Sequence, residues 1–102
     1  MSSAPPLTVR RVARQALEWR REFRRGGTAV GVARARDLAN GRSVSPSTML
    51  RMVSYFARHA VDKKAQGFRR GERGFPSAGR IAWDLWGGDA GMRWVRSASR
   101  RL

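Results

Sequence analysis

Arginine is the most abundant residue type in this sequence that could bind a ligand through charge and hydrogen bonds. The 102 residues include 22 Lys and Arg against seven Asp and Glu, a formal net charge of +15, and only Lys63 and Lys64 are lysines. A guanidinium presents a planar fork of donors that suits phosphates and base edges better than the point charge of lysine does. Because such an excess costs self-repulsion unless polyanions relieve it, we predict contact with nucleic acid. An acidic protein partner, or charge that serves only solubility, remains an alternative.

Residues 39–53 carry the most specific pattern for that chemistry. Ala39, Ser43-Val44-Ser45 and Thr48-Met49 have the spacing found in helix-turn-helix domains of the lac-repressor type, which this stretch resembles. The resemblance implies that Arg51 reads a guanine edge in DNA, while Ser45, Ser47 and Thr48 contact phosphates. It also favours DNA over RNA.

Two residues depart from that pattern. Ser43 stands where the family has its turn glycine, and Gly41 falls where the first helix should still be intact. We therefore expect the connection between the two helices to be longer than a true helix-turn-helix allows. A helical hairpin with no role in reading DNA is therefore the alternative interpretation.

A second group of basic residues lies on a glycine-rich segment, residues 65–76. Flexible arginines there can fold onto a phosphate backbone and release counterions. The alternative is a solvated loop with incidental charge. With the basic residues of the preceding helix, the predicted contacts outside the turn are Arg58, Lys63, Lys64, Arg69, Arg70 and Arg73. The N-terminal arginines are expected to add to this electrostatic contact as a group.

Trp83, Trp86 and Trp94 form an aromatic group among arginines near the carboxyl end. Exposed aromatic rings can stack on single-stranded bases or contact a protein partner. At helical spacing the same residues commonly belong to the core, and that alternative stays open.

Catalysis has few candidate residues. His59 is the only histidine, and Asp62 follows at a spacing that permits contact, but no clear nucleophile accompanies them. The chain has no cysteine and no cluster of metal ligands, so disulfides and thiolate metal sites are excluded. We predict no enzyme activity and no cofactor.

The elements that position these residues are expected to be helical throughout. We predict a disordered leader over residues 1–7, then a single domain over 8–102: a compact all-α bundle of about five helices with a helix-turn-helix-like hairpin. The expected helices are 9–25 capped by Thr8, 29–40 capped by Thr28, 46–63 capped by Ser45, 78–86 capped by Ser77, and one from Ala90 capped by Asp89.

Ion pairs are expected along these helices. Glu18 can pair with Arg21, Glu22 with Arg25, and Asp62 with Arg58. No apolar run approaches the roughly 20 residues that a membrane span needs, and the start lacks the apolar stretch of a secretory signal. We therefore expect no membrane partner.

A specific set of motifs runs from Gly26 to Trp94. They are Gly26-Gly27-Thr28, residues 33–38, Val44-Ser45-Pro46, residues 51–59, Asp62-Lys63-Lys64, residues 76–89 and Trp94. Through them, residues 26–94 resemble a small basic domain encoded by bacteriophages and prophages. The resemblance implies a phage setting, in the host cytoplasm or associated with the virion, without implying an activity. It also implies an acidic phage or host protein as a further partner.

Overall fold

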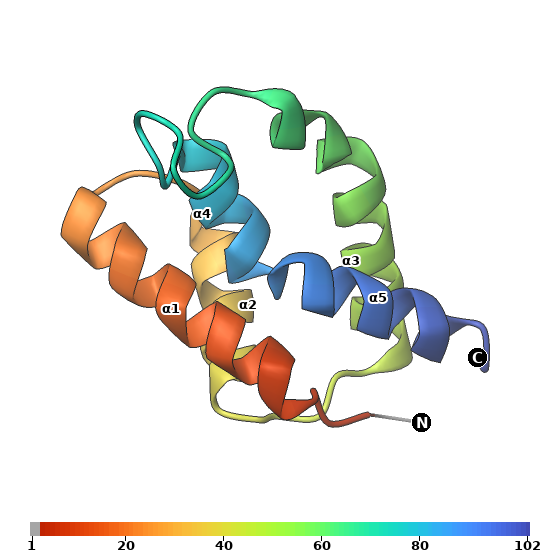
Figure 1. The fold of residues 1–102 in the computed structure, drawn as a ribbon. Helices are drawn as coiled ribbons and strands as arrows, with labels where there is room; N and C mark the ends of the chain where they lie inside the picture. Colours follow the sequence, from red (N-terminus) through yellow and green to blue (C-terminus); the bar gives the residue numbers. More distant parts are fainter. Residues whose placement is uncertain (1–2) are drawn as a thin grey trace.

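The computed structural model describes residues 3–102, which form five α-helices and one 3-10 helix (Figure 1). Apart from one isolated bridge between Ser3 and Val44, these residues form no β-structure, so the predicted all-α class is confirmed. The elements are α1 (Leu7–Phe23), α2 (Ala29–Ala39), α3 (Pro46–His59), η1 (Ala60–Lys64), α4 (Ala78–Leu85) and α5 (Gly88–Ser99).

Side-chain caps begin three of the helices, as the sequence predicts. The side-chain oxygens of Thr28, Ser45 and Ser77 accept hydrogen bonds from the backbone N–H groups three residues on. Each bond satisfies one of the donors that a helix leaves free in its first turn. Pro46 occupies the first turn of α3, where its missing N–H costs nothing.

Other predicted boundaries are wrong. Thr8 is not a cap, because α1 already begins at Leu7, after Pro6. The α-helix expected over 46–63 ends at His59 and continues as the tighter η1. Helix α5 begins at Gly88 rather than Ala90: Gly87, at φ +106°, occupies the cap position, and the Asp89 carboxylate bonds elsewhere.

The expected leader also differs from the structure. Ser3 and Val44 exchange two backbone hydrogen bonds, of 3.1 and 2.7 Å, and Pro5 is fully buried. Residues 3–7 are thus held against the α2–α3 connection rather than disordered. The rest of that prediction, residues 1 and 2, lies outside the described residues.

Two predicted ion pairs on α1 do not form among the described residues. Arg25 donates instead to the carbonyls of Gly74 and Pro76, at 2.9 to 3.3 Å, and so ties the end of α1 to the loop before α4. Glu18 and Glu22 make no ion pair in this part of the chain. Asp62 pairs with His59 at 3.2 Å rather than with Arg58.

The core lies where two groups of packed helices meet. Helix α1 packs on α2 and α4, whereas α3 packs mainly on α5. Figure 1 shows α1 crossing in front of α2, with α3 on the far side of α5. The largest fully buried side chains are Trp83, Phe56, Leu38, Met49, Met52, Ile81 and Leu85. No helix among residues 3–102 is both long and apolar enough to cross a membrane.

Candidate nucleic-acid interface

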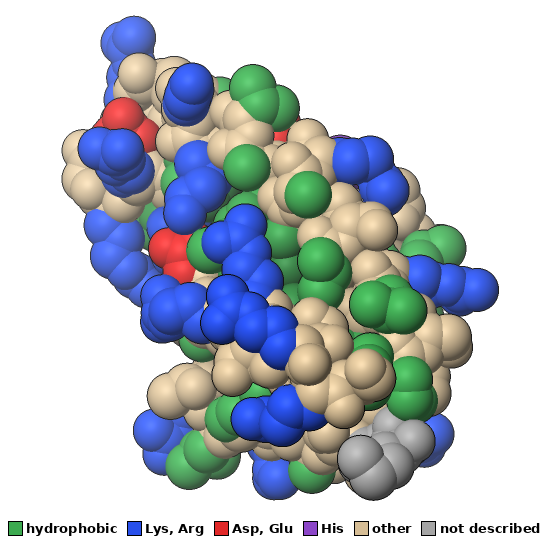
Figure 2. All heavy atoms as spheres, turned by 90° about the vertical axis from the view of Figure 1, so that its right-hand side faces the viewer, with side chains coloured by type: hydrophobic (Ala, Val, Ile, Leu, Met, Phe, Trp, Pro, Cys, Tyr) green, Lys and Arg blue, Asp and Glu red, His purple; other side chains and the backbone are tan. Residues whose placement is uncertain are grey.

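Most basic side chains have no acidic partner. Within residues 3–102, only four of the 22 Lys and Arg side chains lie within 4 Å of a carboxylate, which leaves 18 without one. The four are Arg34, Arg42, Lys63 and Arg80. Figure 2 shows Lys and Arg spread across one face of the molecule, with acidic side chains at only a few points. The positive charge is therefore carried on the surface and is mostly uncompensated.

The hydroxyls predicted to touch phosphate are largely engaged inside the protein. Ser45 Oγ accepts from the Thr48 backbone N–H at 3.3 Å and donates to the Thr48 hydroxyl at 3.1 Å. The Ser47 hydroxyl lies 3.3 Å from the same oxygen. This arrangement fixes the start of α3, so Ser45 and Thr48 act first as structural residues.

Arg51 and Arg58 come together on the wall of a groove with a volume of about 780 Å³. One wall is the exposed face of α3, from Ser47 to Arg58, and the other is formed by the start of α2 and by the side of α4 from Ala78 to Trp86. Leu50 and Val30 add apolar surface, with exposed fractions of 53% and 62%. The groove thus combines basic and apolar side chains.

Three aromatic rings lie against this groove. Tyr55 stacks on Trp86, with ring centroids 4.5 Å apart and planes 7° apart, and on His59, with 4.4 Å and 25°. The Tyr55 hydroxyl is buried without a hydrogen-bond partner in the described chain, and burial raises its pKa above the ordinary value. Because Tyr55 and Arg34 already lie over the Trp86 ring, little of that ring is available to stack on a base.

The α2–α3 connection differs in detail from a helix-turn-helix. Val44 is buried in the turn, as such a hairpin requires, but the residue in the left-handed region is Gly41, at φ +72°. The connection covers residues 40–45, longer than the three or four residues of the usual motif. Moreover, α3 packs mainly on α5 and lines a concave groove, whereas a recognition helix must project into the major groove. The geometry of α3 and its connection therefore does not match that of a recognition helix on which Arg51 would read bases.

The loop arginines lie apart from α3. The Arg70 guanidinium lies 5.7 Å from the Trp19 ring centroid and 5.3 Å from that of Phe75, which holds it against the end of α1. Arg69 and Arg73 are exposed on the loop, and the Arg69 backbone N–H donates to Glu72 at 2.8 Å. Lys64 is likewise exposed at the end of η1.

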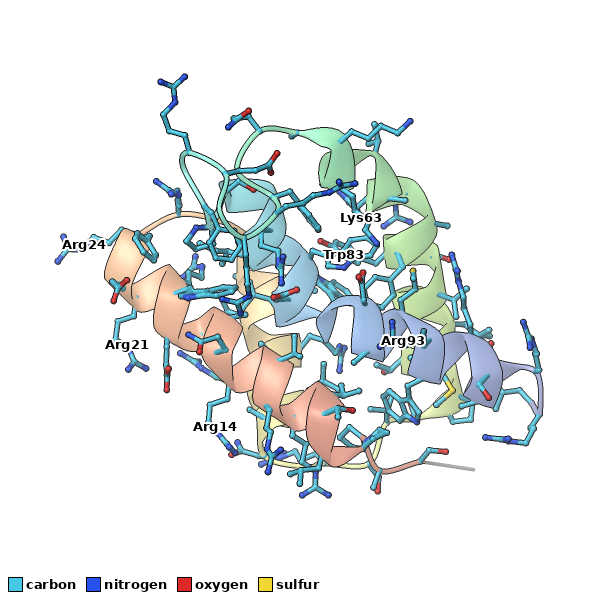
Figure 3. The ribbon with its side chains drawn as sticks, in the orientation of Figure 1. Arg14, Arg21, Arg24, Lys63, Trp83 and Arg93 are labelled. Atoms are coloured by element: carbon cyan, nitrogen blue, oxygen red, sulfur yellow. The ribbon has the colours of Figure 1, made fainter. Side chains whose placement is uncertain are left out.

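Lys63 and Trp83 belong to an internal contact instead. Lys63 Nζ and Trp83 Nε1 both donate to Asp89 Oδ1, at 2.8 and 3.0 Å, and the ammonium lies 5.2 Å from the Trp83 ring centroid (Figure 3). Burial acts to raise the pKa of Asp89, but these hydrogen bonds hold it below its ordinary value. Trp83 is 1% exposed and Trp94 is half-buried against the core, so the core interpretation holds for Trp83.

One acidic side chain is buried. Asp84 is 5% exposed and accepts a hydrogen bond from Arg80 Nε at 3.0 Å, while Arg80 Nη1 donates to the Phe68 carbonyl at 2.8 Å. Burial raises the pKa of Asp84 to about 6, against the lowering effect of Arg80. The pair joins the loop to α4 and is structural.

A basic groove lies between α1 and α2; the sequence predicts electrostatic contact by the N-terminal arginines as a group, but it does not predict a groove. The groove has a volume of about 390 Å³ and is lined by Arg14, Arg20, Arg21 and Arg36, together with Asn40 and three apolar side chains. Arg14 and Arg21 are seven residues apart, so the sequence already indicates that they share one side of the predicted first helix. That Arg36 joins them depends on how α2 crosses α1, which the sequence does not show.

The His59–Asp62 contact, 3.2 Å between Nδ1 and Oδ2, lies at one end of the α3 groove. Across residues 3–102 there is no group of three or more His, Cys, Asp or Glu side chains that could hold a metal ion.

Comparison with known proteins found no match to this chain among protein-family models, curated proteins or solved structures.

Proposed function

We propose that this protein binds nucleic acid, chiefly through phosphate contacts made by arginine. The observation that supports it is the set of 18 Lys and Arg side chains without an acidic partner in the described chain. Phosphates would replace the missing counter-charges and release bound ions, which drives association. Arg51 and Arg58 on α3, and the four arginines between α1 and α2, line the two basic grooves where such contacts would be made.

The form of nucleic acid and the setting are further parts of the proposal. The resemblance of residues 39–53 to DNA-reading domains favours DNA over RNA. From the resemblance of residues 26–94 to a phage domain, we further propose that the protein acts in an infected host or on a virion. Both rest on the sequence alone.

Binding of unrelated probes tests the proposal. We expect the protein to bind two duplex DNAs of unrelated sequence with affinities within about threefold of each other, because phosphate contacts carry no sequence information. Fluorescence anisotropy at about 50 mM salt, where electrostatic binding is strong, measures both. Absence of binding to duplex and single-stranded probes under this condition would refute the proposal.

A second candidate function is docking of an acidic, amphipathic protein segment in the α3 groove. Exposed Leu50 and Val30 beside Arg51 and Arg58 favour it, since apolar contact and charge complementarity then coincide. A synthetic helical peptide with leucines on one face and glutamates on the other is expected to bind, and Leu50→Ser to weaken binding at least fivefold. Equal binding of a peptide with the same composition in scrambled order would reject this candidate.

A further inference from the structure

The α1–α2 groove brings together four arginines from two helices with no acidic side chain among its lining residues. Arg14, Arg20 and Arg21 come from α1, and Arg36 comes from α2. Figure 3 shows Arg14, Arg21 and Arg24 projecting along one edge of α1. A concave site lined by one sign of charge concentrates counter-ions more strongly than a flat surface does.

Two of these arginines are held in place by the fold. Arg14 Nη2 donates to the Ala39 carbonyl at 2.9 Å, which covers the negative end of α2, and Arg20 Nε donates to the Gly26 carbonyl at 2.9 Å. Each guanidinium has five N–H donors, so each keeps donors for a ligand. Because these side chains are already ordered, binding an anion costs less conformational entropy.

Arg21 and Arg36 supply the free part of the site. Neither side chain makes a hydrogen bond or an ion pair with any described residue, and both are exposed. They can therefore turn toward a ligand and grip it with two parallel bonds, as arginine does with phosphate.

The dimensions suit a chain of phosphates better than a single one. Arg14 and Arg21 are seven residues apart, about 10 Å along α1, a span that exceeds one phosphate group and accommodates neighbouring phosphates of one strand. The remaining lining is Leu17, Val32, Ala39 and Asn40, without an aromatic ring on which a base could stack.

We infer that the α1–α2 groove is a sequence-independent binding site for the phosphodiester backbone of nucleic acid. This inference rests on the proposed function and adds to it a site whose four arginines all lie outside residues 39–53, the stretch that resembles a helix-turn-helix. Anionic lipid headgroups share the phosphodiester chemistry, so the test includes them.

The test compares two double variants that each remove two positive charges. Arg21→Ala/Arg36→Ala changes the groove, whereas Arg11→Ala/Arg96→Ala changes exposed helical arginines that line neither the α1–α2 groove nor the α3 groove and make no side-chain bond in the described chain. Binding to a duplex of about 24 base pairs is measured across a salt series. We expect the groove variant to lose at least tenfold in affinity and to flatten the log–log salt slope by about 2, and the control variant to lose less than threefold.

The outcomes are separable. If wild-type protein binds the duplex and both double variants lose affinity equally, the groove inference is wrong and the proposed function stands. If the wild type binds no nucleic acid, the proposed function fails as well. If the protein binds phosphatidylglycerol vesicles but not the duplex, with the same dependence on Arg21 and Arg36, the groove is a lipid site and the inference of a nucleic-acid site is overturned. Arg21→Lys/Arg36→Lys, which retains charge but not the bidentate fork, is expected to lose affinity by an intermediate factor and guards against a folding defect in the alanine variant.

Discussion

At the scale of single residues, the arginines without an acidic partner in the described chain fall into two kinds. Arg14, Arg20 and Arg25 donate to backbone carbonyls and hold helix ends or loops together, while Arg21, Arg36 and Arg51 have no such partner. Their identical chemistry explains why the sequence shows only that the chain is basic. Which arginine is structural depends on which carbonyl the fold places within 3 Å of it.

Asp84 gives a prediction at this scale. Its pKa is about 6 in the folded protein and about 4 in an unfolded chain, so between these values the folded state binds more protons. Stability should therefore fall as pH rises from about 4 to about 6 and then level off. We expect Asp84→Asn to lack this component, which amounts to roughly 2–3 kcal/mol.

Urea unfolding of both proteins at several pH values between 4 and 7 measures the effect as a difference, so that titration of other groups cancels. Asparagine can still accept the Arg80 hydrogen bond, which limits other losses. Parallel stability curves for the two proteins would contradict the raised pKa.

At the scale of elements, local chemistry set the starts of three helices, each capped by a hydroxyl side chain. Thr28, Ser45 and Ser77 were predictable because a cap and its target lie three residues apart. The start of α5 was not predictable. Asp89 is a residue type that often caps helices, but its carboxylate accepts hydrogen bonds from Trp83 and from Lys63 of η1, 26 residues earlier. Long-range partners of this kind leave no local signal.

Ser45 offers a test that separates a structural role from a binding role. Ser45→Ala removes the α3 cap and should lower the free energy of unfolding by about 1 kcal/mol. Because the hydroxyl is already bonded to Thr48, we expect DNA affinity to change less than twofold. Denaturant unfolding and anisotropy measure the two quantities on the same sample.

Ser47→Ala is the matched control, since Ser47 is exposed and does not cap the helix. Its effect on stability should stay below about 0.5 kcal/mol. A large loss of DNA affinity in folded Ser45→Ala, with unchanged stability, would show that Ser45 contacts DNA and would contradict its structural role.

At the scale of the whole molecule, the fold class was predictable and the interface was not. Helical spacing and caps are local, but the pairing of α1 with α2, and of α3 with α5, depends on packing across the chain. The α3 groove contains predicted residues such as Arg51 and Arg58, yet its opposite wall comes from α2 and α4. The α1–α2 groove contains none of the individually predicted contacts.

The excess charge is a property of the molecule as a whole, and its consequence is measurable in one experiment. If nucleic acid supplies the missing counter-charges, the account predicts contacts to at least five phosphates, from the α1–α2 groove together with Arg51 and Arg58. Each contact releases about 0.9 counterion on duplex DNA.

The most direct measurement is therefore the affinity of the wild-type protein for duplex DNA between about 50 and 300 mM salt. The account predicts a straight line of log affinity against log salt with a slope of about −4 or steeper. A slope near zero, or no binding at the lowest salt, would contradict it.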